Sequence, residues 1–121
     1  MSNPTLNGHA PYEVTVHTTG ATLTTNDSGT VHTNTGASGT ITFALPAAVP
    51  GLRYMFSVGA AHELRIDPNG TETISLPSSG VPGAVGKYLT ADAVGESVQL
   101  ACTVAGNWAC FGYTGSWSAE G

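Results

Sequence analysis

The chain has 121 residues, which suits a single domain, and 40% of them are hydrophobic, enough to build a core. Only 9% are charged, and the eight acids outnumber the three bases, Arg53, Arg65 and Lys87. Three scattered cations cannot neutralise a run of phosphates, so the composition excludes nucleic acids and anionic membrane surfaces as partners.

The first eleven residues, MSNPTLNGHAP, predict an extended N-terminal arm. They contain two prolines and an Asn-Gly pair and show no hydrophobic periodicity. The arm is either a free tail or a segment that becomes ordered on a partner. It lacks a basic n-region followed by an apolar h-region, so we expect synthesis in the cytoplasm without a signal peptide. No apolar run approaches the roughly 20 residues of a membrane span. Residues 12–121 are expected to form a single β domain.

From Tyr12 onward the sequence predicts one short strand after another. Apolar and polar residues alternate, and β-branched and aromatic residues are frequent. Glycine, asparagine, aspartate and serine separate the strands as turn residues do. The expected strands are 12–17, 21–24, 29–33, 40–45, 52–58, 62–67, 71–76, 87–90, 96–104, 108–113 and, at the C-terminal edge, 116–118.

Helical periodicity is missing from the sequence, and residues 91–94 supply a single turn at most. About eight to ten short strands separated by turns are typical of an all-β domain. We therefore expect an antiparallel β-sandwich or a β-barrel-like domain.

An apolar corner joins two expected strands within GTITFALPAAVPGLRYMFSV, residues 39–58. Two prolines bracket the tripeptide Ala-Ala-Val at this corner. Loops normally lie in water and are polar, so either the corner packs on its own sheet or another molecule covers it. The second alternative predicts a subunit interface. Its candidate residues are Leu45, Pro46, Val49 and Pro50.

The four histidines do not predict a metal site. A zinc site needs three or four ligands, and the sequence has no closely spaced pair of ligands. His62 begins a stretch that resembles a zinc-protease motif, but the second histidine is missing and the stretch lies on a strand. His17 and His32 share the context Val-His-Thr. We expect them to be surface or half-buried strand residues, neighbours across a sheet or around a symmetry axis; His9 lies in the arm.

The acidic residues do not predict an enzyme. A glycosidase needs two carboxylates that face each other, but those of the expected domain flank turns or alternate outward. Neither a Gly-x-Ser-x-Gly elbow nor a glycine-rich loop leading into a helix occurs. We therefore expect no catalytic residue, no metal site and no cofactor. The carboxylates considered are Glu63, Asp67, Glu72, Asp92 and Glu96.

Cys102 and Cys110 flank the turn at residues 105–107. A three-residue turn places Cys102 directly opposite Cys110, whereas a two-residue turn places it opposite Phe111. The sequence does not decide between these registers. A cross-strand disulfide fits only a narrow geometry, and the cytoplasm is reducing, so we expect two small buried thiols.

The order of four short patterns is the most informative feature of the sequence. The patterns are NTGASGTITFALP at 34–46, GLRYMF at 51–56, IDPNGTETI at 66–74, and GESVQL followed by GNW at 95–100 and 106–108. In this order they resemble small β-domains of tailed-bacteriophage virions, found in capsid decoration (cement) proteins and in tail-fibre or tail-spike modules. The resemblance runs over about residues 22–117 and concerns the fold more than any site.

The resemblance implies a virion structural protein, most simply a capsid decoration protein. Such a protein would bind the outer capsid surface as a homotrimer, with the major capsid protein and its own copies as partners. The arm would extend along the capsid and add a strand to an exposed sheet edge, and repetition over the lattice would strengthen weak contacts. The arm residues expected to bind the capsid are Asn3, Pro4, Thr5, Leu6, Asn7, His9, Pro11 and Tyr12.

The same resemblance leaves an alternative, a tail-fibre, tail-spike or other host-recognition module that binds glycans. Exposed aromatic side chains would then stack on sugars. The sequence has about eleven residues before the domain and no coiled-coil heptads to build a shaft, which favours decoration. A carbohydrate-binding module outside viruses would need an export signal. The aromatic candidates are Tyr88, Trp108, Tyr113 and Trp117.

Overall fold

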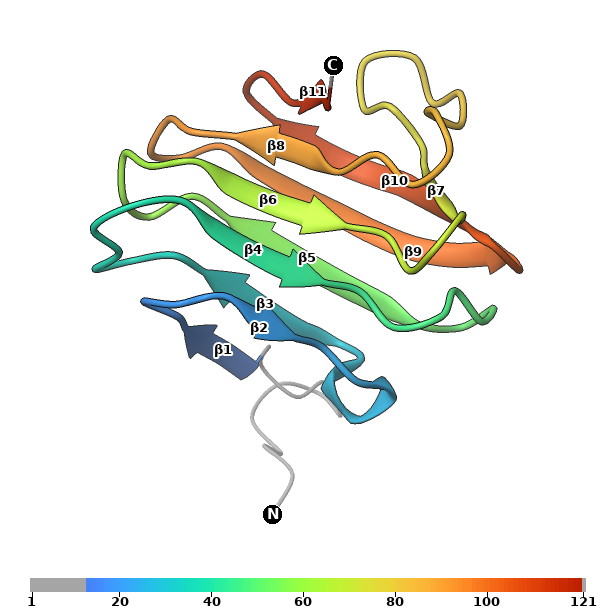
Figure 1. Ribbon diagram of the computed structural model, residues 1–121, viewed down its shortest axis with the longest axis horizontal. Coiled ribbons are helices and arrows are strands. Elements are labelled where there is room, and N and C mark those ends of the chain that lie inside the picture. The colour runs from blue at the N-terminus through green and yellow to red at the C-terminus, as the bar shows by residue number, and fades with distance from the viewer. Residues whose placement is uncertain (1–12, 121) are drawn as a thin grey trace, which may run out of the picture.

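The structure, a computed structural model, describes residues 13–120, which form two β-sheets stacked as a sandwich (Figure 1). Sheet A, the rear layer of Figure 1, contains β1 (Glu13–Val16), β3 (Thr30–Thr33), β5 (Arg53–Ser57), β7 (Thr73–Ile74), β9 (Ser97–Val104) and β10 (Asn107–Thr114). Sheet B, the front layer, contains β2 (Ala21–Thr22), β4 (Ile41–Ala44), β6 (Leu64–Asp67), β8 (Leu89–Ala91) and β11 (Ser118–Ala119). The predicted sandwich is confirmed, and each expected strand overlaps an observed one.

Helical structure in the described part of the chain includes a short 3-10 helix, η2 (Thr25–Asp27). Residues 91–94, for which a single turn at most is expected, contain the end of β8, a bend and the start of a turn. Within residues 13–120 no helix is long and apolar enough to cross a membrane. The predicted arm, residues 1–11, lies outside the described residues.

Strand pairing is mixed, which differs from the expected antiparallel arrangement. Strand order is β1-β3-β5-β9-β10-β7 in sheet A and β11-β8-β6-β4-β2 in sheet B. β1, β3 and β5 run parallel, as do β2, β4 and β6, whereas β9 and β8 join these groups antiparallel. The turn residues were expected to form hairpins, but from β1 to β8 they carry the chain from one sheet to the other. β1 therefore pairs with β3, β2 with β4, β3 with β5, and β4 with β6.

Inward-facing side chains of the two sheets form one core. Tyr54 and Phe56 of β5 alternate inward and pair with strand β9, where Leu100 lies opposite Tyr54. In sheet B, Phe43 of β4 pairs with Ile66 of β6. All five side chains are fully buried. The rings of Phe43 and Phe56 meet across the two layers with centroids 5.5 Å apart, so the period-2 pattern of each strand is what closes the sandwich.

The buried side chain of Asn34, directly after β3, ties two corners of the chain together. Its Oδ1 accepts hydrogen bonds from the backbone N–H groups of Gly59 and Ala60, at 2.7 and 3.1 Å. Its Nδ2 donates to the carbonyls of Ala60 and His62, at 3.3 and 3.2 Å. One amide thus satisfies four backbone groups in the corner between β5 and β6.

We expect Asn34→Ala to lower the free energy of unfolding by about 2–5 kcal/mol, because buried backbone groups lose their partners. Urea denaturation followed by tryptophan fluorescence measures the change. Asn26→Ala, at an exposed position of η2, is the matched control and should stay within about 0.5 kcal/mol of the wild type. An unchanged denaturation midpoint for Asn34→Ala would show that other contacts hold the two corners.

Candidate functional site

The arm residues expected to bind a capsid lie outside the described residues, so their role stays a prediction. They are Asn3, Pro4, Thr5, Leu6, Asn7, His9, Pro11 and Tyr12. The strand that follows them directly, β1, is the edge strand of sheet A. A segment that leaves this strand therefore starts at an edge of the sandwich.

The apolar corner at residues 45–50 is divided between the core and the surface. Leu45 and Ala48 are each 4% exposed and belong to the core, whereas Val49 is 52% exposed. Leu45 continues the inward alternation of β4, so its assignment to a subunit interface is wrong: its side chain is not accessible to a partner. The accessible members of the predicted interface are Pro46, Val49 and Pro50.

The outward face of sheet A carries few charges across four strands. Because positions alternate along a strand, the neighbours of buried residues point outward. Paired residues form one row over β1, β3, β5 and β9, here called the outer row: Val14, Val31, Met55 and Gln99. Val14 is 59% exposed. Among the outward positions of sheet A strands within residues 13–120, Arg53 at the start of β5 is the only charged residue.

The outward face of sheet B carries an ionic cluster instead. Arg65 of the central strand β6 forms an ion pair with Glu63, and its guanidinium lies 4.6 Å from the centroid of the Tyr88 ring. The hydrogen bond with Glu63 is the main cause that raises the pKa of Arg65. The two faces of the sandwich therefore differ: one is uncharged over most of its width and the other is ionic.

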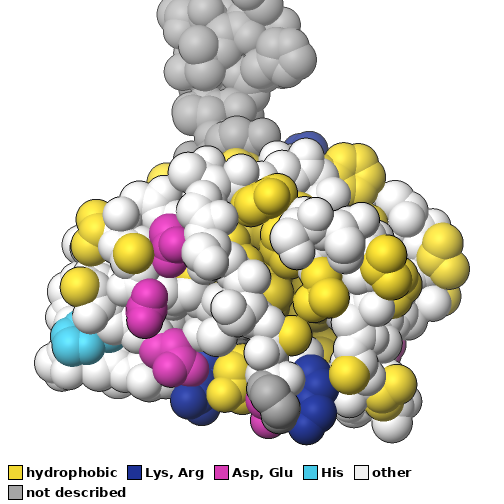
Figure 2. All heavy atoms as spheres, turned by 90° about the horizontal axis from the view of Figure 1, so that it is seen from above, with side chains coloured by type: hydrophobic (Ala, Val, Ile, Leu, Met, Phe, Trp, Pro, Cys, Tyr) yellow, Lys and Arg dark blue, Asp and Glu magenta, His cyan; other side chains and the backbone are white. Residues whose placement is uncertain are grey.

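A second apolar surface runs along the free part of β10. Strand β7 pairs with β10 only at Asn107 and Trp108, so the remaining edge has no strand partner among the described residues. Phe111 and Tyr113 in this part are 60% and 47% exposed. Figure 2 looks onto the side of the molecule where β10 and β11 lie and shows hydrophobic atoms gathered across its middle. An unpaired edge with apolar side chains is a template for another strand.

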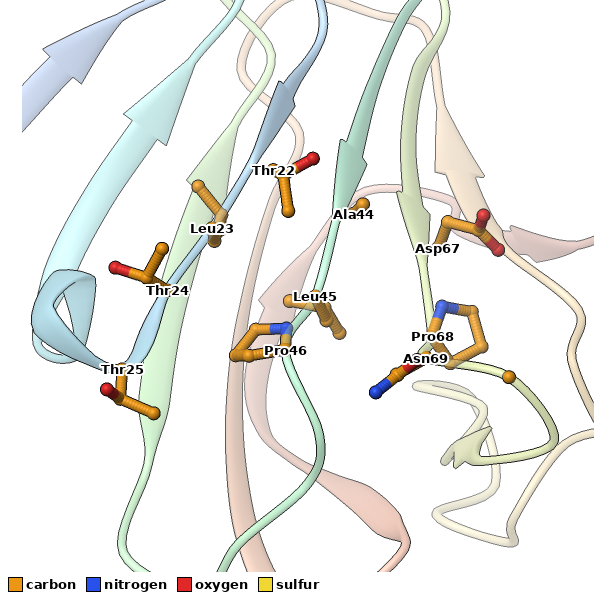
Figure 3. Close-up of a pocket in the computed structure, with 11 residues that line it drawn as sticks. Thr22, Leu23, Thr24, Thr25, Ala44, Leu45, Pro46, Asp67, Pro68 and Asn69 are labelled. Carbon is orange, nitrogen blue, oxygen red and sulfur yellow. The ribbon is translucent and has the colours of Figure 1, made fainter.

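An open groove of about 620 Å³ lies where β2, β4 and β6 end (Figure 3). Three parallel strands end at the same side, so the residues that follow them converge there. Figure 3 shows Pro46, after β4, between Thr24 and Asn69. Asp67 also lines the groove, and its pKa is raised by burial and then by Glu120. The lining contains hydroxyl groups, an amide and a carboxylate but no aromatic ring, so it lacks a stacking surface for a sugar.

Two of the four aromatic candidates for glycan stacking are buried, and a third is covered on one face of its ring. Trp108 is 0% and Trp117 is 8% exposed, and the indole N–H of Trp117 donates to the Ser97 carbonyl at 2.9 Å. The ring of Tyr88 is covered by the Arg65 guanidinium, as described above. The prediction of exposed stacking residues is therefore wrong for both tryptophans, and Tyr113 remains accessible.

His17 and His32 are neighbours within one chain, which confirms one of the two expected arrangements. Nε2 of His17 lies 3.0 Å from Nδ1 of His32. His17 follows β1 and is half-buried, whereas His32 on β3 is 2% exposed. The Phe43 ring from sheet B stands edge-on to His17 at 4.8 Å. Burial lowers the pKa of both imidazoles, and His17 lowers that of His32 further, while Asp27 opposes both shifts.

Carboxylates that were considered for catalysis bind the protein itself. Glu63 pairs with an arginine, and Glu72 accepts a hydrogen bond from the Ala48 N–H at 2.9 Å. Glu96 accepts one from the Ser116 N–H at 2.6 Å, and this bond is the main cause that lowers the pKa of Glu96. These three groups hold corners and strands together. The others are Asp67 in the groove and Asp92, which is exposed.

The β9–β10 hairpin follows neither expected register. A register shift directly after the turn places Cys102 opposite Trp108 and Cys110 opposite Leu100. The reason is a β-bulge, an extra residue on one strand that no turn-length rule predicts. Both cysteines are free thiols; Cys102 is buried and Cys110 is half-buried. Burial is the main cause that raises the pKa of Cys102.

No model of a known protein family matches this chain, and no curated protein matches it significantly. Residues 13–120 contain no group of three or more histidine, cysteine, aspartate or glutamate side chains that could hold a metal ion. The function is therefore argued from the surfaces of the sandwich.

The outer row and Phe111 are surface features that the sequence alone did not single out. Alternation within β5 predicts that Met55 points away from Tyr54, but the side that faces the second sheet becomes known only from the strand pairing. Phe111 sits between two paired residues of β10 at a register shift. The sequence did contain a sign of the apolar surface on β10, since the aromatic residues Phe111 and Tyr113 continue the final hairpin beyond the buried Trp108.

We expect Leu45→Ala to lower the free energy of unfolding by about 2–5 kcal/mol, because it empties part of the core. The matched variant Val49→Ala, at the other side of the same corner, should stay within about 0.5 kcal/mol of the wild type. Thermal or urea denaturation distinguishes the two. Equal losses would mean that the corner is buried as a whole.

Proposed function

We propose that this protein is a structural component of a tailed-bacteriophage virion, a capsid decoration protein made in the host cytoplasm. It docks on the outer capsid surface as a homotrimer and stabilises the shell. The observation that carries the proposal is the uncharged outer row on sheet A, opposed to the ionic face of sheet B. A protein that sits on a lattice needs one face for the lattice and another for water.

The outer row suits docking because its burial desolvates no ionic group. Transfer of a charge out of water is costly unless it is paired, and Val14, Val31, Met55 and Gln99 carry none. Contacts of moderate strength are enough, since many copies bind a repeating surface and the shell gains from each.

The two edges of sheet A suit the contacts that the resemblance implies. β1 lies at one edge and directly follows the predicted arm, which in this proposal adds a strand to the major capsid protein. At the other edge, the free part of β10 with Phe111 and Tyr113 is the proposed contact between copies of the trimer. A host-recognition role is less well supported, because both tryptophan candidates are buried and one face of the Tyr88 ring is covered by Arg65, which leaves Tyr113 as the freely accessible candidate.

We expect Met55→Glu to reduce occupancy of the capsid at least about tenfold, because the new carboxylate would be buried unpaired at the interface. Thr42→Glu, at a half-buried outward position of β4 in sheet B, is the matched control and should bind like the wild type. Purified virions of the encoding phage are compared by quantitative mass spectrometry, with circular dichroism to confirm folding. Equal occupancy for both variants would exclude sheet A as the docking face.

The wild-type copy number tests the location itself. A decoration protein should approach the copy number of the major capsid protein, whereas a handful of copies per particle would indicate a tail device. Deletion of residues 1–11 should lower occupancy if the arm adds a strand to the capsid, and unchanged occupancy would remove the arm from the proposal.

A further inference from the structure

Among residues 13–120, edge strand β1 has a strand partner on one side only, β3. Directly after the strand, the backbone N–H of His17 donates to the Thr33 carbonyl at 2.9 Å, and its ring reaches inward to His32. His17 therefore fastens the end of β1 to the core. Four paired residues, Glu13–Val16, make a short strand, so this fastening is a large part of what holds it.

The donor and acceptor of each hydrogen bond around His17 and His32 follow from the number of N–H and O–H groups that these side chains carry. The hydroxyl of Thr30 donates to the Asp27 carbonyl, so its oxygen accepts from Nε2–H of His32, 2.6 Å away. A neutral imidazole carries one N–H, which leaves Nδ1 of His32 as an acceptor. The bond between the rings is then donated by Nε2–H of His17. The chain runs from His17 through His32 and Thr30 to Asp27, with both rings neutral.

An added proton disturbs this chain at either ring. On His32 it occupies Nδ1, and two N–H donors then face each other across 3.0 Å unless His17 transfers its own proton from Nε2 to Nδ1. On His17 it occupies Nδ1 and preserves the inter-ring bond, but it places a positive charge in a half-buried ring that packs against the uncharged Phe43 ring, where burial disfavours the charge. Outward rotation of His17 relieves both conflicts and unfastens β1.

The groups around the pair offer little to offset the charge. Asp27 of η2 is the one carboxylate that acts on both imidazoles. Tyr54 of β5 donates its hydroxyl to the Thr24 carbonyl at 2.8 Å and stays neutral, since burial raises its pKa to about 12. From β4 and β5 the neighbours are the uncharged rings of Phe43 and Phe56, and on β1 itself Glu13 is exposed.

We propose that the hydrogen-bonded pair His17–His32 is a proton-operated latch that holds β1 on β3 at neutral pH and releases it on acidification. Release removes Val14 from the outer row and makes β3 the new edge of sheet A. It also detaches the point at which residues 1–12 join the domain. The latch goes beyond the proposed function and holds or fails independently of it.

The sign of the pH dependence follows from linkage. Burial lowers the pKa of His17 and His32 below the ordinary value of 6.5 in the latched form, whereas release of β1 solvates His17 and removes it from the side of His32. The released form therefore binds more protons between pH 6.5 and the lowered values. Latching is complete above about pH 6.5 and is lost below it, by up to about tenfold per pH unit for each histidine.

Amide hydrogen exchange of the full chain, read by NMR from about pH 7.5 to about pH 5 and corrected for the intrinsic exchange rate, tests the latch. We expect protection of Val14, Thr15 and Val16 to fall below pH 6.5 by up to about tenfold per unit for each histidine. His17→Gln supplies an N–H donor near the position of Nε2 but takes up no proton, so it should lose at least half of this dependence. His62→Gln, in the β5–β6 corner, is the matched control and should behave like the wild type.

Constant protection of β1 in the wild type, or an equally steep fall in His17→Gln, would overturn the latch. If His17→Gln does not fold, nitrogen NMR of the wild-type rings decides the matter. Nε2–H tautomers of both histidines at neutral pH support the latch, and an Nδ1–H tautomer of His32 contradicts it.

Discussion

The amide of Asn34 forms hydrogen bonds with four backbone groups in the corner between β5 and β6. The half of the sandwich built from the parallel strands β1 to β6 depends on that contact. The strands β1 to β6 pair in parallel with strands from the next pass of the chain, so no hairpin turn sets their register. Two things set it instead: the inward alternation of residues such as His32 and Phe56, and the fixed distance between corners that Asn34 bridges. A slip by one residue would turn both rings out of the core.

The core and the surface of sheet A are coupled through β1. This strand contributes Val14 to the outer row, and the residue after it contributes a ring to the core. In the proposed latch, titration of one buried pair alters the outer row, although the outer row itself carries no ionisable group. In the proposed latch, a chain with few charges gains a pH response from groups inside the sandwich, where burial is the largest cause that lowers their pKa.

Sequence reasoning located the strands well and their partners poorly. Alternation in residues such as Ile41 and Phe43, with glycine-rich turns between runs, marks strands because it reflects a local property, the pleat of the backbone. A turn does not tell which sheet comes next, so the parallel pairing was missed. The burial of Trp108 and the position of Cys102 depend on a β-bulge and on the second sheet, both set by distant residues. The contact between His17 and His32 could be predicted as one of two alternatives, because both histidines stand in the sequence Val-His-Thr on expected strands.

The antiparallel junction between β5 and β9 has a consequence for the order of events in the cell. The ring of Tyr54 on β5 lies against that of Trp108, at a centroid distance of 5.5 Å, and Leu100 of β9 stands opposite Tyr54. Until residues 97–108 have left the ribosome, β5 lacks its antiparallel neighbour β9 and the Tyr54 ring lacks the Trp108 ring. Closure of sheet A therefore waits for these residues, and nascent chains expose the Tyr54 ring to chaperones until they emerge.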